Sequence, residues 1–112
     1  NLLVWNRSVK LASNIYKKTS NFPKDELYGL TLQIRRSTIS ISSNIAEGAG
    51  RQSKKAFASF LGISYGSACE LETQLIIAKD LNYLAEDEFT SLFHDLNEIQ
   101  KMLYALEKKQ RI

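Results

Sequence analysis

The chain has 112 residues, with Lys+Arg 15 and Asp+Glu 12 giving a formal net charge of +3. That length suits one domain with a single core, and two independently folding domains are not expected. Hydrophobic residues make up 44% of the chain, while five glycines and one proline are few. This composition fits neither a disordered tail nor a turn-rich all-β fold, so one mostly helical domain over residues 1–112 is predicted.

The first expected helix covers about residues 2–19. Helical spacing places apolar side chains on one side and basic side chains on the opposite side. The apolar set is Trp5, Val9, Ala12, Ile15 and Tyr16, and the basic set is Arg7, Lys10, Lys17 and Lys18. An amphipathic helix with a basic outer face is therefore predicted.

The second expected helix runs from about residue 24 to residue 47, with Pro23 in its first turn and acids near its start. Its core stripe is Leu27, Leu30, Ile34, Thr38, Ile41 and Ile45. A second apolar stripe on the opposite side is Tyr28, Leu32, Ile39 and Ala46. The stretch STISIS at residues 37–42 alternates like a short strand, which leaves a kink or an edge strand as alternatives.

The third expected helix, about residues 53–81, also has two sides. Its core stripe is Phe57, Phe60, Leu61, Ser64, Ala68, Leu71, Leu75 and Ala78. Its far side carries Gly62, Gly66, Cys69, Thr73 and Ile77, all small or apolar. Because a glycine costs about 1 kcal/mol relative to alanine inside a helix, two of them one turn apart indicate close approach by another element.

The fourth expected helix, residues 86–110, has one apolar side, acids at its start and basic residues at its end. That apolar side is Phe89, Leu92, Phe93, Leu96, Ile99, Leu103 and Leu106. Four helices joined by short turns predict an all-α, up-down-up-down antiparallel four-helix bundle. The spare apolar surface on the second and third helices predicts a homo-oligomer. The expected interface residues are Tyr28, Leu32, Ile39, Gly62 and Gly66.

Catalytic and metal chemistry find little support. The single cysteine excludes a disulfide framework and a multi-cysteine metal site, and a cytoplasmic location is expected. His94 is expected on the surface and Cys69 packed among small residues, so no nucleophile, base and orienting group assemble. No apolar run approaches the roughly 18 to 20 residues that span a bilayer. A non-enzyme without cofactor, metal or membrane partner is predicted.

The block YGLTLQIRRSTISISSNIAEGAGRQSKKAF, followed by ELETQLIIAKDLNYL, resembles the bacterial four-helix-bundle proteins encoded in intervening sequences of 23S ribosomal RNA genes, the S23 family. The segments LVWNRSVKLASNIYKKT and LYALEKK extend this resemblance over nearly the whole chain. The accessory variability protein of diversity-generating retroelements is similar to the same family. The resemblance implies a ring, expected to be a pentamer, with suspected nucleic-acid binding and no established catalytic activity.

Three polar residues within the resembling block are Arg36, Asn44 and Glu47. Eleven residues at about 1.5 Å rise put Arg36 and Glu47 roughly 16 Å apart, too far to pair within one straight helix. Their partners would come from other helices or subunits. A polar network that fixes packing register is the favoured interpretation, because unpaired buried charges are costly, and direct RNA contact is the alternative.

Charge is unevenly distributed, with a net +7 over residues 1–60 and a net −4 over residues 61–112. The first half is therefore the candidate for a polyanion partner, most simply RNA. The expected contacts are Arg7, Lys10, Lys17, Lys18, Arg35, Arg51, Lys54 and Lys55. Lys101, Lys108 and Lys109, interspersed with acids, are expected to matter little. The alternative function is a scaffold or accessory subunit that docks a reverse transcriptase or another nucleic-acid enzyme.

Overall fold

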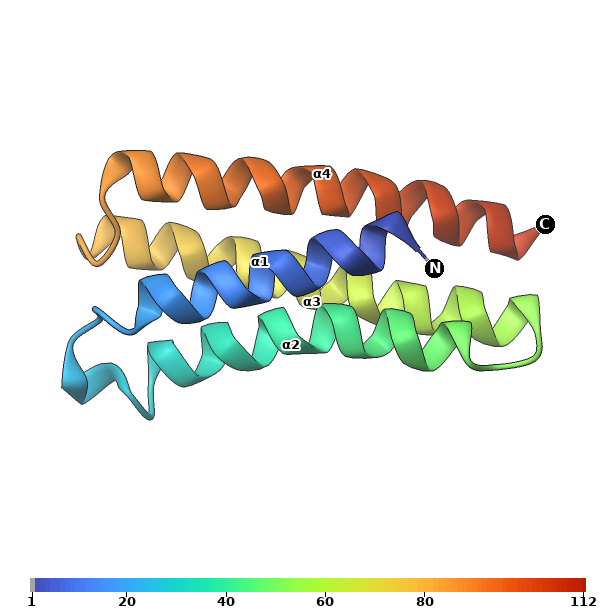
Figure 1. Ribbon diagram of the computed structural model, residues 1–112, viewed down its shortest axis with the longest axis horizontal. Coiled ribbons are helices and arrows are strands. Elements are labelled where there is room, and N and C mark those ends of the chain that lie inside the picture. The colour runs from blue at the N-terminus through green and yellow to red at the C-terminus, as the bar shows by residue number, and fades with distance from the viewer. Residues whose placement is uncertain (1) are drawn as a thin grey trace.

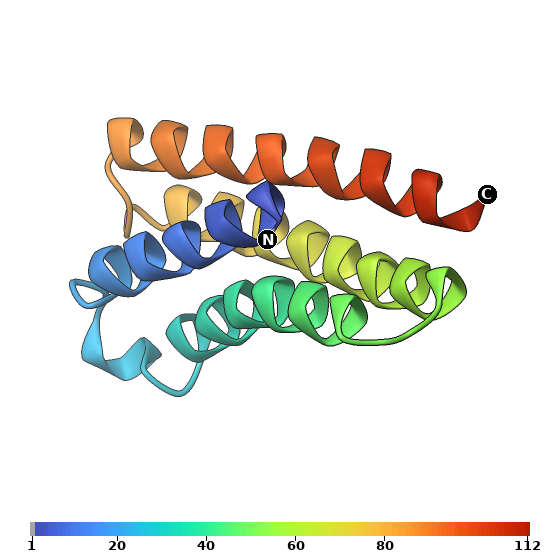
Figure 2. The same ribbon diagram turned by 45° about the vertical axis from the view of Figure 1, so that its right-hand side comes forward.

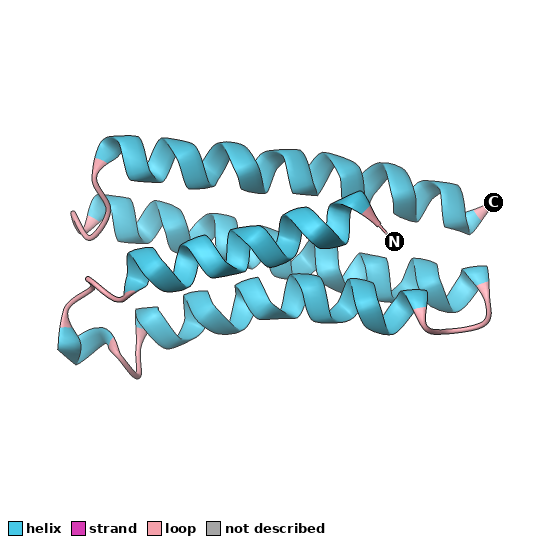
Figure 3. Cartoon of the chain, viewed as in Figure 1, coloured by secondary structure: helices cyan, strands magenta, loops and turns pink. Residues whose placement is uncertain are grey.

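A computed structural model describes residues 2–112. Its elements are α1 (Leu3–Thr19), the 3₁₀ helix η1 (Lys24–Glu26), α2 (Leu30–Ala49), α3 (Lys54–Asp80) and α4 (Glu86–Arg111). Figure 1 shows the four long helices side by side with alternating direction, in a body of 43 × 24 × 20 Å. No strand occurs within residues 2–112, and α2 passes through residues 37–42 as continuous helix (Figure 3). The predicted all-helical class is confirmed for this range.

Helices that follow one another along the chain pack together, and α1 closes the bundle against α4. Aliphatic side chains from all four helices fill the centre. The largest fully buried ones are Leu11, Ile15, Ile34, Ile41, Ile45, Leu61, Leu71, Leu75, Leu96, Ile99 and Leu103. The core stripes expected for the last two helices agree with this burial, with aromatic residues at the ends of those stripes half-buried.

The expected apolar side of the first helix is wrong by a rotation about the helix axis. Trp5, Val9 and Tyr16 are each 38–39% exposed, whereas α1 buries Val4, Ser8, Leu11, Ile15 and Thr19. Ser8 enters the core because its hydroxyl donates to the Val4 carbonyl at 2.7 Å, which satisfies the polar group inside the helix. In the sequence Ser8 counts as a polar residue, so the buried stripe of α1 is not recognised from hydropathy.

The second helix begins later than expected. Residues 24–26 form η1, and α2 starts only at Leu30, so Leu27 lies outside the helix and is 47% exposed. Glu26 supplies the missing cap: its Oε1 accepts from the Leu30 backbone N–H at 3.1 Å, and its Oε2 accepts from the Tyr83 hydroxyl at 2.9 Å. The hydrogen bond from the Tyr83 hydroxyl to Glu26 raises the pKa of Tyr83. The break therefore ties the α1–α2 connection to the α3–α4 turn.

The most extensive contact between two helices is that of α2 with α3. A Cβ on Gly48 would lie 2.7 Å from the Phe60 Cβ, so only glycine permits this approach. Farther along the pair, the Ser64 hydroxyl donates to the Ile41 carbonyl at 2.8 Å. The Ser40 and Ser67 hydroxyls share a hydrogen bond of 2.7 Å. Small residues thus bring the two backbones together along much of their length.

Replacing Gly48 with alanine should destabilise the fold. The added methyl meets the Cβ of Phe60, which sits next to the backbone and cannot swing aside, so we expect a loss of about 1–3 kcal/mol in unfolding free energy. Urea denaturation followed by circular dichroism measures this loss. Gly50→Ala is the matched control, because a Cβ there meets only backbone oxygens at 3.5 and 3.6 Å. Equal stability of the two variants would contradict the close approach.

Candidate nucleic-acid interface

The outer face of α2 forms an open groove of about 590 Å³ near the start of the helix. Its lining contains two arginines and no acidic residue. The lining residues are Tyr16, Leu27, Tyr28, Leu32, Arg35, Arg36, Ile39, Ser40, Ser43 and Asn44. Tyr28 is 86% exposed and Ile39 is 44% exposed, so the second apolar stripe of this helix faces away from the core.

The far side of α3 is also exposed. Positions for a Cβ on Gly62 and Gly66 have no atom within 4 Å, so no element of the same chain approaches them. Cys69, expected to be packed, is exposed, although partial burial and the nearby Glu72 raise its thiol pKa. Ile77, 43% exposed, continues the same side. Both faces expected at a subunit interface are therefore uncovered in the single chain.

The three polar residues of the second helix do not contact one another within residues 2–112. The Asn44 amide donates to the carbonyl and the hydroxyl of Ser40 at 2.8 and 2.9 Å. Glu47 pairs with Arg51 at 2.8 Å, one turn farther along. Arg36 is exposed and lines the α2 groove. A network joining Arg36 to the other two thus needs a second subunit.

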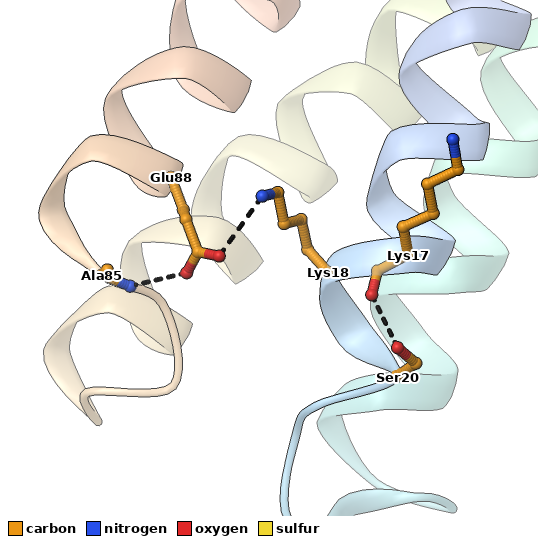
Figure 4. A network of polar contacts seen from close by, with 5 residues as sticks. All are labelled: Lys17, Lys18, Ser20, Ala85 and Glu88. Carbon is orange, nitrogen blue, oxygen red and sulfur yellow. Dashed lines mark hydrogen bonds and ion pairs between the residues drawn. The ribbon is translucent and has the colours of Figure 1, made fainter.

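The eight predicted nucleic-acid contacts fall into three groups, of which the first surrounds the end of α1. Lys18 forms an ion pair of 3.3 Å with Glu88 at the start of α4, as Figure 4 shows. The Arg35 guanidinium lies 4.5 Å above the Tyr16 ring and donates to the Thr19 hydroxyl at 2.9 Å. Two of these cations therefore hold helices together, and only Lys17 points outward without an ion pair in the described chain.

The second group is Arg7 and Lys10 on α1. Both line an opening of about 500 Å³ between α1 and α4, together with His94, Asp95 and Glu98. The two carboxylates offset the two cations across this groove. This part of the basic outer face therefore presents little net charge to a polyanion.

The third group lies at the α2–α3 turn and meets basic residues from the other end of the chain. Figures 1 and 2 both place this turn beside the C-terminal end of α4. Lys54, Lys55 and Arg111 line one opening of about 590 Å³, which Glu107 and Ile112 also border. We call the cations at this end of the bundle the basic end: Lys54, Lys55 and Arg111 line the opening, and Arg51, Lys108 and Lys109 lie within three residues of them along the chain.

Half of the basic end lies outside the contacts predicted from the sequence. Lys108 and Lys109 were expected to matter little, but the antiparallel topology brings the end of α4 next to the start of α3. Arg51 pairs with Glu47 and Arg111 pairs with Glu107, at 2.8 and 2.9 Å. The four lysines make no ion pair within residues 2–112, so six cations stand against two acids.

Residues 1–105 match the model of the 23S rRNA-intervening sequence protein family. The chain belongs to this family. A crystal structure of a protein with unknown function from the S23 ribosomal protein family of Bacteroides thetaiotaomicron is similar, with a TM-score of 0.85 and 30% identity. The similarity covers 95% of this chain and 99% of that one. Among curated proteins, none matches.

The described residues also bear on membrane and metal sites. Over residues 2–112, no helix is both long and apolar enough to cross a membrane. The same range contains no group of three or more His, Cys, Asp or Glu side chains placed to hold a metal ion. Neither family description names a catalytic activity.

Glu88 should make the free energy of unfolding fall at acidic pH. It accepts from the Ala85 backbone N–H at 3.0 Å and from Lys18, and these contacts lower its pKa below the ordinary 4.5. Its contribution is therefore complete above pH 4.5 and disappears as the pH falls through the lower folded pKa. Glu88→Gln should cost about 0.5 kcal/mol at pH 7, and the stability difference should narrow as the pH falls below 4.5 and through the folded pKa of Glu88. Urea unfolding at pH 7 and at successively lower pH values measures this difference, and an unchanged difference would contradict this role.

Proposed function

We propose that this protein binds nucleic acid, most simply RNA, through the basic end, as a non-catalytic homo-oligomer. The observation that carries this proposal is the meeting of basic residues from two chain segments, 51–55 and 108–111, at one end of the bundle. Phosphate attraction grows with each cation through counterion release, and a ring would repeat the cluster in every subunit. RNA is favoured over DNA by the family description, which refers to sequences intervening in 23S rRNA.

Stability alone does not account for the lysines at the start of α3. A helix N-terminus carries partial positive charge, so cations in the first turn cost about 0.3–1 kcal/mol each. The first turn of α3 contains no acid, and only the Ser53 hydroxyl caps it, accepting from the Ala56 N–H at 3.0 Å. Anions bind readily at such N-termini. Lys54 and Lys55 therefore add to an existing preference for phosphate.

Removing three lysines of the basic end should weaken RNA binding and flatten its salt dependence. Each phosphate contact contributes about 0.7 to 0.9 to the slope of log affinity against log salt. Lys54→Gln/Lys55→Gln/Lys108→Gln should therefore lower that slope by about 2 for each subunit engaged. Fluorescence anisotropy of a labelled RNA between 50 and 300 mM salt measures the slope, and DNA should respond alike because phosphate contacts read no bases.

The matched control removes the same charge elsewhere: Lys10→Gln/Lys17→Gln/Lys24→Gln. Because the structure favours the basic end, this control should retain more affinity and a steeper slope. If the two variants behave alike, binding follows net charge only. If the parent binds no RNA at 50 mM salt, the proposed function is wrong.

We further propose that the ring forms when the α2 face of one subunit packs on the α3 face of the next, with five subunits expected. The two faces differ: the α2 groove carries Tyr28, Leu32, Ile39 and Arg36, whereas the α3 face carries Gly62, Gly66 and Ile77 with Glu70 among them. Unlike faces make heterologous contacts, which close into rings. Arg36, without an ion pair inside the described chain, would then meet a face that carries Glu70.

Bulky substitutions on the α3 face should dissociate the assembly without unfolding the subunit. Gly66→Leu places a large side chain where backbones would approach, and its site is open in the single chain. Native mass spectrometry should show the parent as an oligomer and the variant as smaller species with unchanged helical circular dichroism. Ala105→Leu, on the exposed surface of α4, is the control and should stay assembled. A monomeric parent at micromolar concentration would refute assembly.

The second candidate function is a scaffold that docks a reverse transcriptase or another nucleic-acid enzyme. The uncovered α2 and α3 faces favour it, because exposed apolar surface indicates a protein partner. On this hypothesis the basic end would hold the template of the bound enzyme. Parent protein that stays monomeric and binds RNA only together with such an enzyme would favour the scaffold.

A further inference from the structure

We propose that the groove between α3 and α4 binds an unpaired strand, with a base stacked on the tyrosine pair Tyr65 and Tyr104. The proposal rests on the proposed nucleic-acid binding and adds the kind of nucleic acid that the site selects. Phosphates would lie on the basic end, and the strand would continue from there along the groove. The protein would thus prefer single strands to duplexes.

The tyrosine pair is exposed, with one ring contributed by each helix. The two ring centroids lie 6.4 Å apart with an interplanar angle of 54°, one ring from α3 and the other from α4. Tyr65 is 37% exposed and Tyr104 is 56% exposed. The rings border an opening of about 370 Å³ whose other lining residues are Asn97, Gln100 and Lys101. A ring face with neighbouring amide and amino groups offers both stacking and hydrogen bonds to a base.

The tyrosine opening and the basic end lie along the same helix pair. Successive turns of two antiparallel helices line both: residues 54–59 and 107–112 at the basic end, then Tyr65 and residues 97–104. On α4 the side chains at 97, 101, 104, 108 and 111 repeat every three or four residues and so share one face. Lys108 follows Tyr104 by about 6 Å along the helix axis. The tyrosine pair therefore lies between Lys101 and Lys108 along one track.

Acids near this track are already engaged. Glu98 pairs with Lys101 at 3.4 Å, and Glu107 pairs with Arg111. The Gln100 amide donates to the Glu72 carboxylate at 2.9 Å, which leaves its own carbonyl for a base. The Lys101 side chain is 76% exposed and can exchange its partner for a phosphate. Beside the tyrosines the Glu98 and Lys101 charges cancel, while Glu72 keeps its negative charge, so stacking, not attraction, must supply the binding energy there.

Stacking on the tyrosines and phosphate contacts to the lysines respond differently to single strands and duplexes. Base-aromatic stacking contributes about 1–3 kcal/mol per base and accepts any base, because every base has a flat face. A paired base is stacked within its helix and cannot lie on a side-chain ring without unpairing. Phosphates are present in both forms. The lysines should therefore bind duplex and single strand alike, while the tyrosines should favour the single strand.

The test compares Tyr104→Ala with Tyr104→Phe in the full chain, using a labelled 20-nucleotide poly(U) RNA and a duplex RNA of equal length. Tyr104→Ala should weaken poly(U) binding at least about fivefold, as a loss of 1 kcal/mol or more implies. Tyr104→Phe should restore it, because the ring remains. Duplex affinity should stay within about twofold for both variants. Circular dichroism and native mass spectrometry verify that folding and assembly are unchanged.

The outcomes separate this inference from the function on which it rests. If the parent binds both RNAs and Tyr104→Ala weakens both equally or neither, the tyrosine site is wrong and binding by the basic end stands. If Tyr104→Ala dissociates the oligomer, the pair belongs to a contact between copies and the inference is overturned. If the parent binds neither RNA, both proposals fall.

Discussion

The close packing of α2 on α3 is the constraint on which the remaining structure depends. Gly48 removes the one side chain that would separate the helices, and serine hydroxyls extend the contact through Ser64 and the Ser40–Ser67 pair. Two helices held at this distance bury their facing sides completely, and their second apolar sides must then point outward. The same packing sets the α2–α3 turn at one end of the bundle. The candidate interfaces are consequences of this approach.

Sequence periodicity predicted the helices well wherever the buried residues are apolar and the exposed residues are polar. α3 and α4 bury the expected aliphatic stripes. Those side chains carry no hydrogen-bonding group, so hydropathy alone predicts their burial. The pattern failed on α1, where Ser8 and Thr19 are buried and bond the carbonyls one turn back, at 2.7 Å each. It also failed at the start of α2, where the cap comes from Glu26 through a local break. Both errors arise from side-chain to backbone hydrogen bonds, which hydropathy does not describe.

Charge along the chain was a weaker guide to the candidate site than charge in space. Lys18 and Arg35 look free in the sequence, yet each bonds a partner on another helix. Lys108 belongs to the acidic half of the chain, yet the alternating direction of the helices brings the C-terminal end of α4, where it lies, to the same end of the bundle as the start of α3. Net charge by segment ignores which helix ends meet. Once the bundle topology is given, the basic end follows from it without further assumptions.

α3 and α4, which meet at the basic end, differ in how the charges at their ends relate to the helix dipole. α4 begins with Glu86, Asp87 and Glu88 and ends with basic residues, the order that lowers its electrostatic energy. α3 begins with two lysines and no acid, which raises its energy at the same end of the molecule where α4 gathers its cations. Like charges from both helices therefore accumulate where each repels the other. This repulsion lowers the stability of the subunit. A bound polyanion would neutralise the positive charges and remove that cost.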